Sequence, residues 1–147
     1  MQLRERLTAD MKEAMKSRDT LRLSVIRMVI SSVKNRDIEL RRELNDSEIT
    51  DAIVSLCKQR RESIRLFKEA GRQDLVEKEE AELALMQEFL PQQLTREELE
   101  SLVDQAIAET AATSGKDMGK VMKALQPQVS GRADGKLVSE VVKQKLA

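Results

Sequence analysis

The spacing of apolar positions along the chain predicts helices from one end to the other. Leu3, Leu7 and Met11 recur at steps of four, with charged residues between them, which predicts an amphipathic helix over residues 3–16. Later segments repeat the same three- and four-residue spacing. No run alternates over strand length with turn glycines, so the chain is predicted to be all-α.

Three further helices are predicted before the middle of the chain. The second runs from about Asp19 to about Glu43, and its polar second half, NRDIELRRE, is expected to project from the core. The third begins with Asp46 as its N-cap and ends before Gly71, a typical residue just past a helix end. The fourth stops at Pro91, because proline cannot continue a helix.

The segment LPQQL, residues 90–94, is predicted to separate two domains. The first, an N-terminal four-helix domain, would span residues 1–91. The second, a small C-terminal three-helix domain, would span residues 92–147.

The shorter helices of the second domain are marked by their end signals. Thr95 opens the sequence TREE, a capping box in which threonine accepts an amide three residues on and the glutamate reaches back. The helix that follows is predicted to end at Ser114. Asp117 is predicted to cap the next helix, which runs until Pro127, and Asp134 is predicted to cap the last one.

Composition removes several classes of chemistry. The chain has no histidine, which is the commonest general base and metal ligand, and Cys57 is its one cysteine. Cys57 lies on or near an apolar helix face and is predicted to be a buried filler. We therefore assign no catalytic residue and expect no metal and no cofactor. With charges every few residues at its start and no long apolar run, the chain is expected to be cytoplasmic, without a membrane partner.

Four weaker patterns have ordinary structural interpretations. The segment Gly131–Lys136 has too few residues between its glycines for a phosphate loop, and no strand precedes it. The sequence Ser55–Lys58 matches S-x-x-K without the partner motifs of that enzyme class. Arg60 falls on an apolar line, so it must extend to solvent or find an acidic partner. The remaining pattern, a set of carboxylates in the fourth helix, is expected to be a solvated face: Glu77, Glu79, Glu80 and Glu82.

Local charge asymmetry is the stronger evidence, because 26 basic and 26 acidic side chains leave no net charge. Residues 114–147 carry seven bases and three acids, whereas residues 95–113 carry one base and five acids. The tail could contact an RNA backbone through lysines on one helix face and through free amides at helix starts, or it could merely offset the acidic helix. With aromatic side chains at 1%, shape and phosphate recognition would have to suffice. The candidate residues are Lys116, Lys120, Lys123, Arg132 and Lys136.

A second basic segment lies in the second helix, again with seven bases and three acids. It could be a solvated face whose positive charge is balanced by the acidic residues of the fourth helix. The bases are Arg18, Arg22, Arg27, Lys34, Arg36, Arg41 and Arg42.

The order and spacing of several segments resemble the YqeY family of GatB/YqeY-domain proteins along nearly the whole chain. The segments are RDTLRLSVIRMV from Arg18, FKEAGRQDL from Phe67, FLPQQL from Phe89, KDMGKVM from Lys116 and GRADGK from Gly131. The resemblance implies an all-α fold similar to the tail of GatB, a subunit of the tRNA-dependent amidotransferase. In that enzyme the tail helps to hold the tRNA, and the catalytic parts lie elsewhere.

The resemblance carries no catalytic residue onto this chain, but it places a tRNA contact at the matching segments around Lys116–Lys123 and Arg132–Lys136. The first hypothesis is a non-catalytic tRNA-binding accessory module that assists aminoacyl-tRNA formation or transamidation. An aminoacyl-tRNA synthetase or an amidotransferase component would be its protein partner. The alternative is a protein–protein interaction module. The least favoured hypothesis is a carbon–nitrogen ligase that acts alone with glutamine as amido donor.

Overall fold

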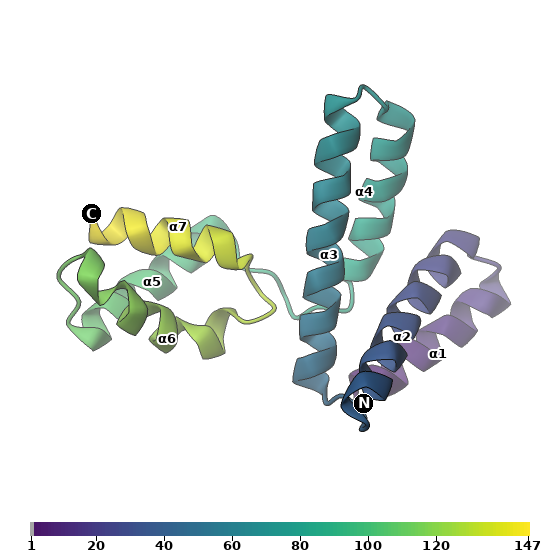
Figure 1. Ribbon diagram of the computed structural model, residues 1–147, viewed down its shortest axis with the longest axis horizontal. Coiled ribbons are helices and arrows are strands. Elements are labelled where there is room, and N and C mark those ends of the chain that lie inside the picture. Colours follow the sequence, from purple (N-terminus) through teal and green to yellow (C-terminus); the bar gives the residue numbers. More distant parts are fainter. Residues whose placement is uncertain (1) are drawn as a thin grey trace. The chain divides into compact units, whose positions relative to one another are not determined.

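The computed structural model describes residues 2–147 and is all-helical, as predicted from the sequence (Figure 1). It contains seven α-helices, and no strand occurs in the described range. The chain forms two compact units, Met1–Leu90 and Pro91–Ala147, and we describe each by itself as the amino-terminal and the carboxyl-terminal unit. Across residues 2–147, every helix is either too short or too polar to cross a membrane.

The amino-terminal unit consists of two helical hairpins. The first is formed by α1 (Leu3–Ser17) and α2 (Thr20–Leu40), and the second by α3 (Asp46–Glu69) and α4 (Gln73–Gln87) (Figure 1). Helix α2 packs against the other three helices, which explains its broad apolar stripe. The buried core includes Leu7, Val25, Ile26, Val29, Val33, Ile49, Ile53, Met86 and Phe89.

Two helices end earlier than their sequences predict. Helix α2 ends at Leu40 rather than near Glu43, because Arg41 adopts a left-handed conformation with φ of 56°. Helix α5 (Arg96–Thr110) ends before Ser114, because Ala111 turns the chain with φ of 54°. Glycine usually occupies such positions, so arginine and alanine gave no sequence signal for these ends.

The first residue of α3 was also mispredicted by one position. Asn45, not Asp46, is the N-cap: its side chain accepts the amide of Glu48, and the Glu48 carboxylate accepts the amide of Asn45. This is a complete capping box. The Asp46 carboxylate instead accepts the amide of Leu3 at 3.2 Å, which ties the start of α1 to the start of α3.

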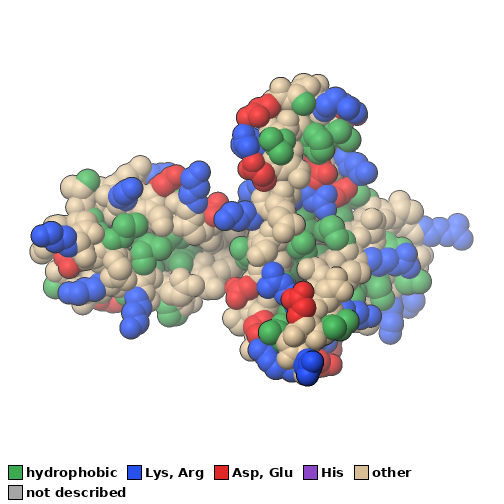
Figure 2. All heavy atoms as spheres, viewed as in Figure 1, with side chains coloured by type: hydrophobic (Ala, Val, Ile, Leu, Met, Phe, Trp, Pro, Cys, Tyr) green, Lys and Arg blue, Asp and Glu red, His purple; other side chains and the backbone are tan. Residues whose placement is uncertain are grey.

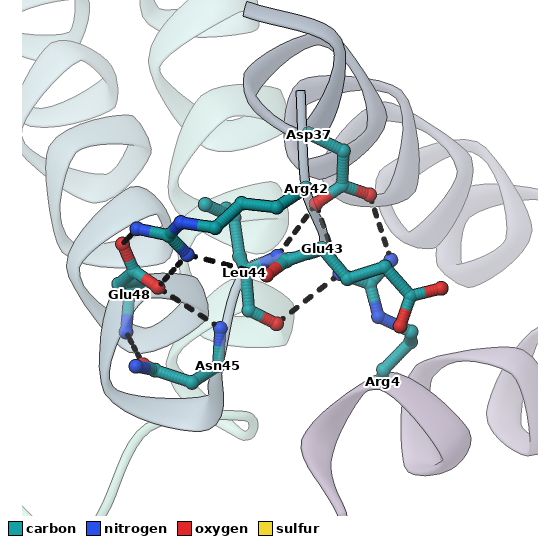
Figure 3. A network of polar contacts seen from close by, with 7 residues as sticks. All are labelled: Arg4, Asp37, Arg42, Glu43, Leu44, Asn45 and Glu48. Carbon is teal, nitrogen blue, oxygen red and sulfur yellow. Dashed lines mark hydrogen bonds and ion pairs between the residues drawn. The ribbon is translucent and has the colours of Figure 1, made fainter. Parts of the chain in front are cut away.

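The polar segment 35–43 is exposed except for half-buried Asp37, as the sequence predicts, and Asp37 ties the carboxyl end of α2 to α1. Arg4 from α1 forms two hydrogen bonds to the Asp37 carboxylate, at 2.9 and 3.0 Å, and a third to the carbonyl of Leu44 at 3.3 Å (Figure 3). Asp37 also accepts the amide of Leu44 at 2.8 Å. These bonds hold the loop between α2 and α3 against α1, and they lower the pKa of the Asp37 carboxyl, chiefly through Arg4.

Glu48 makes the fold sensitive to acid. Its carboxylate accepts two hydrogen bonds from Arg42, both at 2.8 Å, and one from the Asn45 amide (Figure 3). Arg42 first, and then Asn45, lower the pKa of Glu48 from 4.5 to about 2. A lowered carboxyl pKa in the folded state contributes stability that is complete above the unfolded pKa and is lost as pH falls toward the folded pKa.

We expect Arg42→Gln to flatten the loss of stability between about pH 5 and pH 2, because the pKa of Glu48 then moves back toward its ordinary value. The measurement is the thermal midpoint as a function of pH. Arg36→Gln, at an exposed site on α2 without an ion pair in the described residues, should leave the slope unchanged. Equal slopes for the wild type and Arg42→Gln would contradict the assignment.

The carboxyl-terminal unit packs α5 against α6 (Met118–Val129) and α7 (Gly135–Leu146), with a 3-10 turn at Gly115–Asp117 (Figure 1). Helix α6 continues through Pro127 to Val129, so the predicted stop at this proline was wrong. Thr95 accepts the amide of Glu98, as predicted. The core consists mainly of aliphatic residues: Leu99, Val103, Val121, Leu125, Val138, Val141, Val142 and Leu146.

Candidate nucleic-acid interface

Three lysines lie on or just before α6. Lys120 and Lys123 are three residues apart within the helix, on the side opposite Val121 and Leu125, and Lys116 lies in the 3-10 turn that precedes it. All three are exposed, whereas the two apolar residues are fully buried in the core. We call Lys116, Lys120 and Lys123 the α6 lysine face.

Neighbouring acids leave most of the tail cations free. Within residues 2–147, Lys116 and Lys123 form no ion pair. Lys120 lies 3.8 Å from Asp117, but its side chain is 70% exposed, so the pair is weak. Of the tail cations, Lys145 is the one that reaches α5, 3.4 Å from Asp104. Direct ion pairs with acidic residues therefore account for few of the tail cations in the described range.

Figure 2 shows how the charges are distributed on the face drawn. Lysine and arginine side chains are spread around the carboxyl-terminal unit, with fewer acidic side chains among them. On the hairpin of α3 and α4, acidic and basic side chains are intermixed, as their ion pairs require.

The two aspartates predicted to cap the tail helices behave differently. Asp117 is the N-cap residue of α6, as predicted, but its side chain makes no capping bond and instead accepts the amide of Thr113 at 3.0 Å. That backbone bond is the main reason why the pKa of Asp117 is lowered. Asp134 caps α7 as predicted and accepts the amide of Lys136 at 3.1 Å. One of the amides expected to be free at the start of α7 is thus already occupied.

The other two candidates lie apart from the α6 lysine face. Arg132 is half-buried in the turn after α6, where its guanidinium donates to the carbonyls of Gln92 at 3.0 Å and Gln128 at 3.3 Å. Lys136 is exposed in the first turn of α7, beyond the carboxyl end of α6, with Lys143 seven residues further along the same side. Arg132 therefore has a structural role in this turn, which its charge alone did not indicate.

Gly119 leaves open space within the α6 lysine face. It lies in the first turn of α6, and a Cβ atom added there would meet nothing within 4 Å. Glycine in a helix costs about 1 kcal/mol relative to alanine, and no contact within the chain requires it here. The open backbone beside Lys116, Lys120 and Lys123 is well suited to close approach by a ligand.

A shallow groove of about 490 Å³ lies on another side of the same unit. Arg132 lines it together with acidic residues of α5, Glu97 and Glu98. Two carboxylates against one arginine, itself bonded to backbone carbonyls, make this groove unsuitable for a polyanion.

The remaining chemical candidates are structural. Cys57 is 1% exposed, and burial raises the pKa of its thiol, against the opposing effect of Arg61 and Arg60, which confirms a filler role. The segment Gly131–Lys136 contains the turn from α6 into α7 and the first two residues of α7, and it is not a phosphate loop after a strand. Among the described residues, no group of three acidic or cysteine side chains could hold a metal ion.

The carboxylates of α4 are not simply a solvated face, contrary to the prediction. Glu79 and Glu82 each place an oxygen 2.6 Å from Arg60 Nη1, and their side chains are only 17% and 13% exposed. Arg60 thus has the acidic partner that its position required. Glu77 and Glu80 are exposed as expected. The sequence indicated that Arg60 needed a partner but not which residues would supply it.

Together these features define a small helical protein with exposed lysines along the last-but-one helix of its carboxyl-terminal unit. The chain matches the family described as "Yqey-like protein" over residues 4–146. It belongs to the YqeY family.

Curated relatives of the chain include fungal proteins named "Altered inheritance of mitochondria protein 41, mitochondrial". The Kluyveromyces lactis protein is 36% identical over 107 residues, which cover 70% of this chain and 57% of the relative. The Pyrenophora tritici-repentis protein is 32% identical over 145 residues, covering 95% and 78%. The Lachancea thermotolerans protein is 37% identical over 87 residues, covering 58% and 46%. The chain thus spans about half the length of several of these relatives.

Proposed function

We propose that this protein is a non-catalytic tRNA-binding accessory module that assists aminoacyl-tRNA formation or transamidation. The observation that carries the proposal is the α6 lysine face: Lys116, Lys120 and Lys123 are exposed on one side of a short helix and are scarcely neutralised by neighbouring acids. Lysines arranged in this way release counterions from a phosphate backbone, which drives salt-dependent binding to nucleic acid.

The mode of recognition follows from what the chain lacks. Its aromatic residues are Phe67 and Phe89, and Phe89 is buried. Phe67 is half-buried, so the chain offers few aromatic surfaces on which unpaired bases could stack. We therefore expect recognition through contacts with phosphates and with the shape of a folded RNA. A folded tRNA offers such a surface, and the family resemblance to the tail of GatB points to the same ligand.

The test is binding of unfractionated tRNA by the full chain over a series of salt concentrations. We expect log K to fall linearly with log salt, and the triple variant K116E/K120E/K123E to bind more weakly, with a slope smaller by about 2 to 3. The control K58E/R61E/K78E makes the same charge change at exposed positions on α3 and α4 and should bind like the wild type. Equal binding by the wild type and the α6 variant would refute the proposal.

A protein partner remains the alternative function, favoured by two exposed apolar side chains near the end of α2. Ile38 is 73% exposed and Leu40 is 50% exposed. Co-purification of one protein in stoichiometric amounts, insensitive to RNase and lost in Ile38→Ser/Leu40→Ser, would support this alternative. An aminoacyl-tRNA synthetase or an amidotransferase component recovered in this way would be compatible with both functions.

Two further expectations belong to the proposal. Glutamine-dependent amide formation by the purified protein alone, with charged tRNA and ATP, should be undetectable, and such turnover would show a carbon–nitrogen ligase instead. The cytoplasmic location expected from the sequence stays a prediction, because the names of the fungal relatives contain the word "mitochondrial". Cell fractionation would test it.

A further inference from the structure

Helix α2 exposes a face that its own unit does not use. Ser24, Arg27, Ser31, Lys34 and Ile38 follow one another at steps of three and four, and all five are exposed. The buried residues of the helix lie on the opposite side, where they face α1, α3 and α4. We call this line of five residues the α2 outer face.

No acidic side chain lies on the α2 outer face. Asp19 is used as the N-cap, where it accepts the amide of Arg22, and Asp37 points to Arg4 and the Leu44 amide. Glu39 follows Ile38 directly and therefore points about 100° away from it. The acids of the helix are thus directed away from the exposed cations.

The basic residues of α2 fall into two groups. Arg22 is bonded to Glu88 at 2.6 Å and belongs to the packing of the unit. Arg27 and Lys34, in contrast, form no ion pair with any residue in 2–147, and neither does Arg41 just past the helix end. The acidic residues of α4 therefore form no ion pairs with Arg27, Lys34 or Arg41, contrary to one interpretation of the sequence.

The α2 outer face combines two cations with two hydroxyl groups. Arg27 and Lys34 are seven residues apart, which is about 10.5 Å along the helix axis, and Ser24 and Ser31 place hydroxyl groups between and beside them. Arginine, lysine and serine are the side chains that typically contact phosphate oxygens in protein–nucleic acid complexes. The small serines also allow a ligand to approach the helix closely.

A second helix is a poorer occupant of this face than a polyanion. The pattern has a seven-residue period, but Arg27 and Lys34 would lie at the centre of a helix–helix contact. Lysine is depleted at the centres of protein interfaces, and burying these charges without acids would carry a large desolvation cost. Ile38 alone offers too little apolar surface to compensate.

We propose that the α2 outer face is a second contact surface for the phosphate backbone of RNA, on the other unit from the α6 lysine face. This inference rests on the proposed function for the choice of tRNA as ligand, but it concerns different residues. The two cationic faces belong to different units, and each is tested by itself.

The test compares three charge-reversal variants of the full chain for binding to unfractionated tRNA over a series of salt concentrations. R27E/K34E is expected to bind more weakly than the wild type, with the slope of log K against log salt smaller by about 1.4 to 1.8. K58E/R61E makes the same charge change on exposed positions of α3 in the same unit and should match the wild type. K116E/K120E/K123E reports on the α6 lysine face. R27Q/K34Q, which introduces no acid, gives a second measure if the first variant folds poorly by circular dichroism.

The outcomes separate the two proposals. Loss of binding in R27E/K34E but not in K58E/R61E supports the inference, whether or not the α6 variant is also weakened. Wild-type binding by R27E/K34E, together with weak binding by the α6 variant, overturns the inference and leaves the proposed function intact. If R27E/K34E and K58E/R61E weaken tRNA binding equally, the loss is an effect of net charge, and the inference is overturned. Absence of tRNA binding by the wild type overturns both the inference and the proposed function. In that case, binding to phosphatidylserine vesicles by the wild type, lost in R27E/K34E, would show that the α2 outer face contacts a membrane surface instead.

Discussion

Replacing Leu125 by alanine is expected to destabilise the carboxyl-terminal unit by about 2 to 5 kcal/mol, the range for leucine-to-alanine changes in a packed core. Leu125 is 0% exposed and lies in α6, between α5 and α7. A unit of roughly 60 residues buries little apolar surface, and its whole stability is about 3 to 9 kcal/mol at typical values per residue. A large part of that stability would therefore be lost.

Hydrogen exchange of the amides in α5, α6 and α7 measures this effect, because their opening free energy should fall by the same amount. Leu137→Ala makes the same chemical change at a half-buried position of α7 and is the matched control, with a smaller expected loss. If the two variants exchanged at the same rate, the central place of Leu125 in this core would be wrong.

Arg60→Met is expected to destabilise the amino-terminal unit by about 2 to 3 kcal/mol. Arg60 Nη1 lies 2.6 Å from carboxylate oxygens of both Glu79 and Glu82, and Nη2 lies 3.0 Å from the Met28 sulfur. Removing the guanidinium leaves two half-buried carboxylates three residues apart on α4 without a cation, and breaking a buried ion pair costs more than forming it contributes. The side chains are 13% to 18% exposed, so the expected loss is smaller than for a fully buried pair.

Urea unfolding of four proteins tests this assignment. Arg61→Met, at the exposed neighbouring position of α3, should remain close to the wild type. The triple variant R60M/E79Q/E82Q should recover most of the loss, because no unpaired charge remains. A triple variant as unstable as Arg60→Met alone would show that Arg60 contributes by packing and not by charge.

The course of the helices and the α6 lysine face could be predicted because both depend on local sequence. Apolar spacing defines a helix and its buried side, so Lys120 and Lys123 had to share the exposed side once α6 formed. The order of motifs along the chain was equally informative, since the match to the YqeY family extends over residues 4–146. The errors at the ends of α2 and α5 came from Arg41 and Ala111, because arginine and alanine do not indicate a left-handed conformation in the sequence.

Which charges remain free could not be predicted, because ion pairs join residues from helices that are distant in sequence. Arg132 counted as a binding candidate, yet its guanidinium is bonded to the carbonyls of Gln92 and Gln128. In the sequence, the seven basic residues of the second helix form one group. In the structure, Arg22 is bonded to Glu88, whereas Arg27 and Lys34 are exposed on the α2 outer face.

The sequence by itself determined that this protein is helical throughout, to which family it belongs, and on which side of α6 its lysines lie. The tertiary structure alone decided which cations are bound within the protein and which are free for a ligand. The physical reason is range: helical periodicity is set by neighbours within one or two turns, whereas ion pairing depends on how whole helices pack against each other.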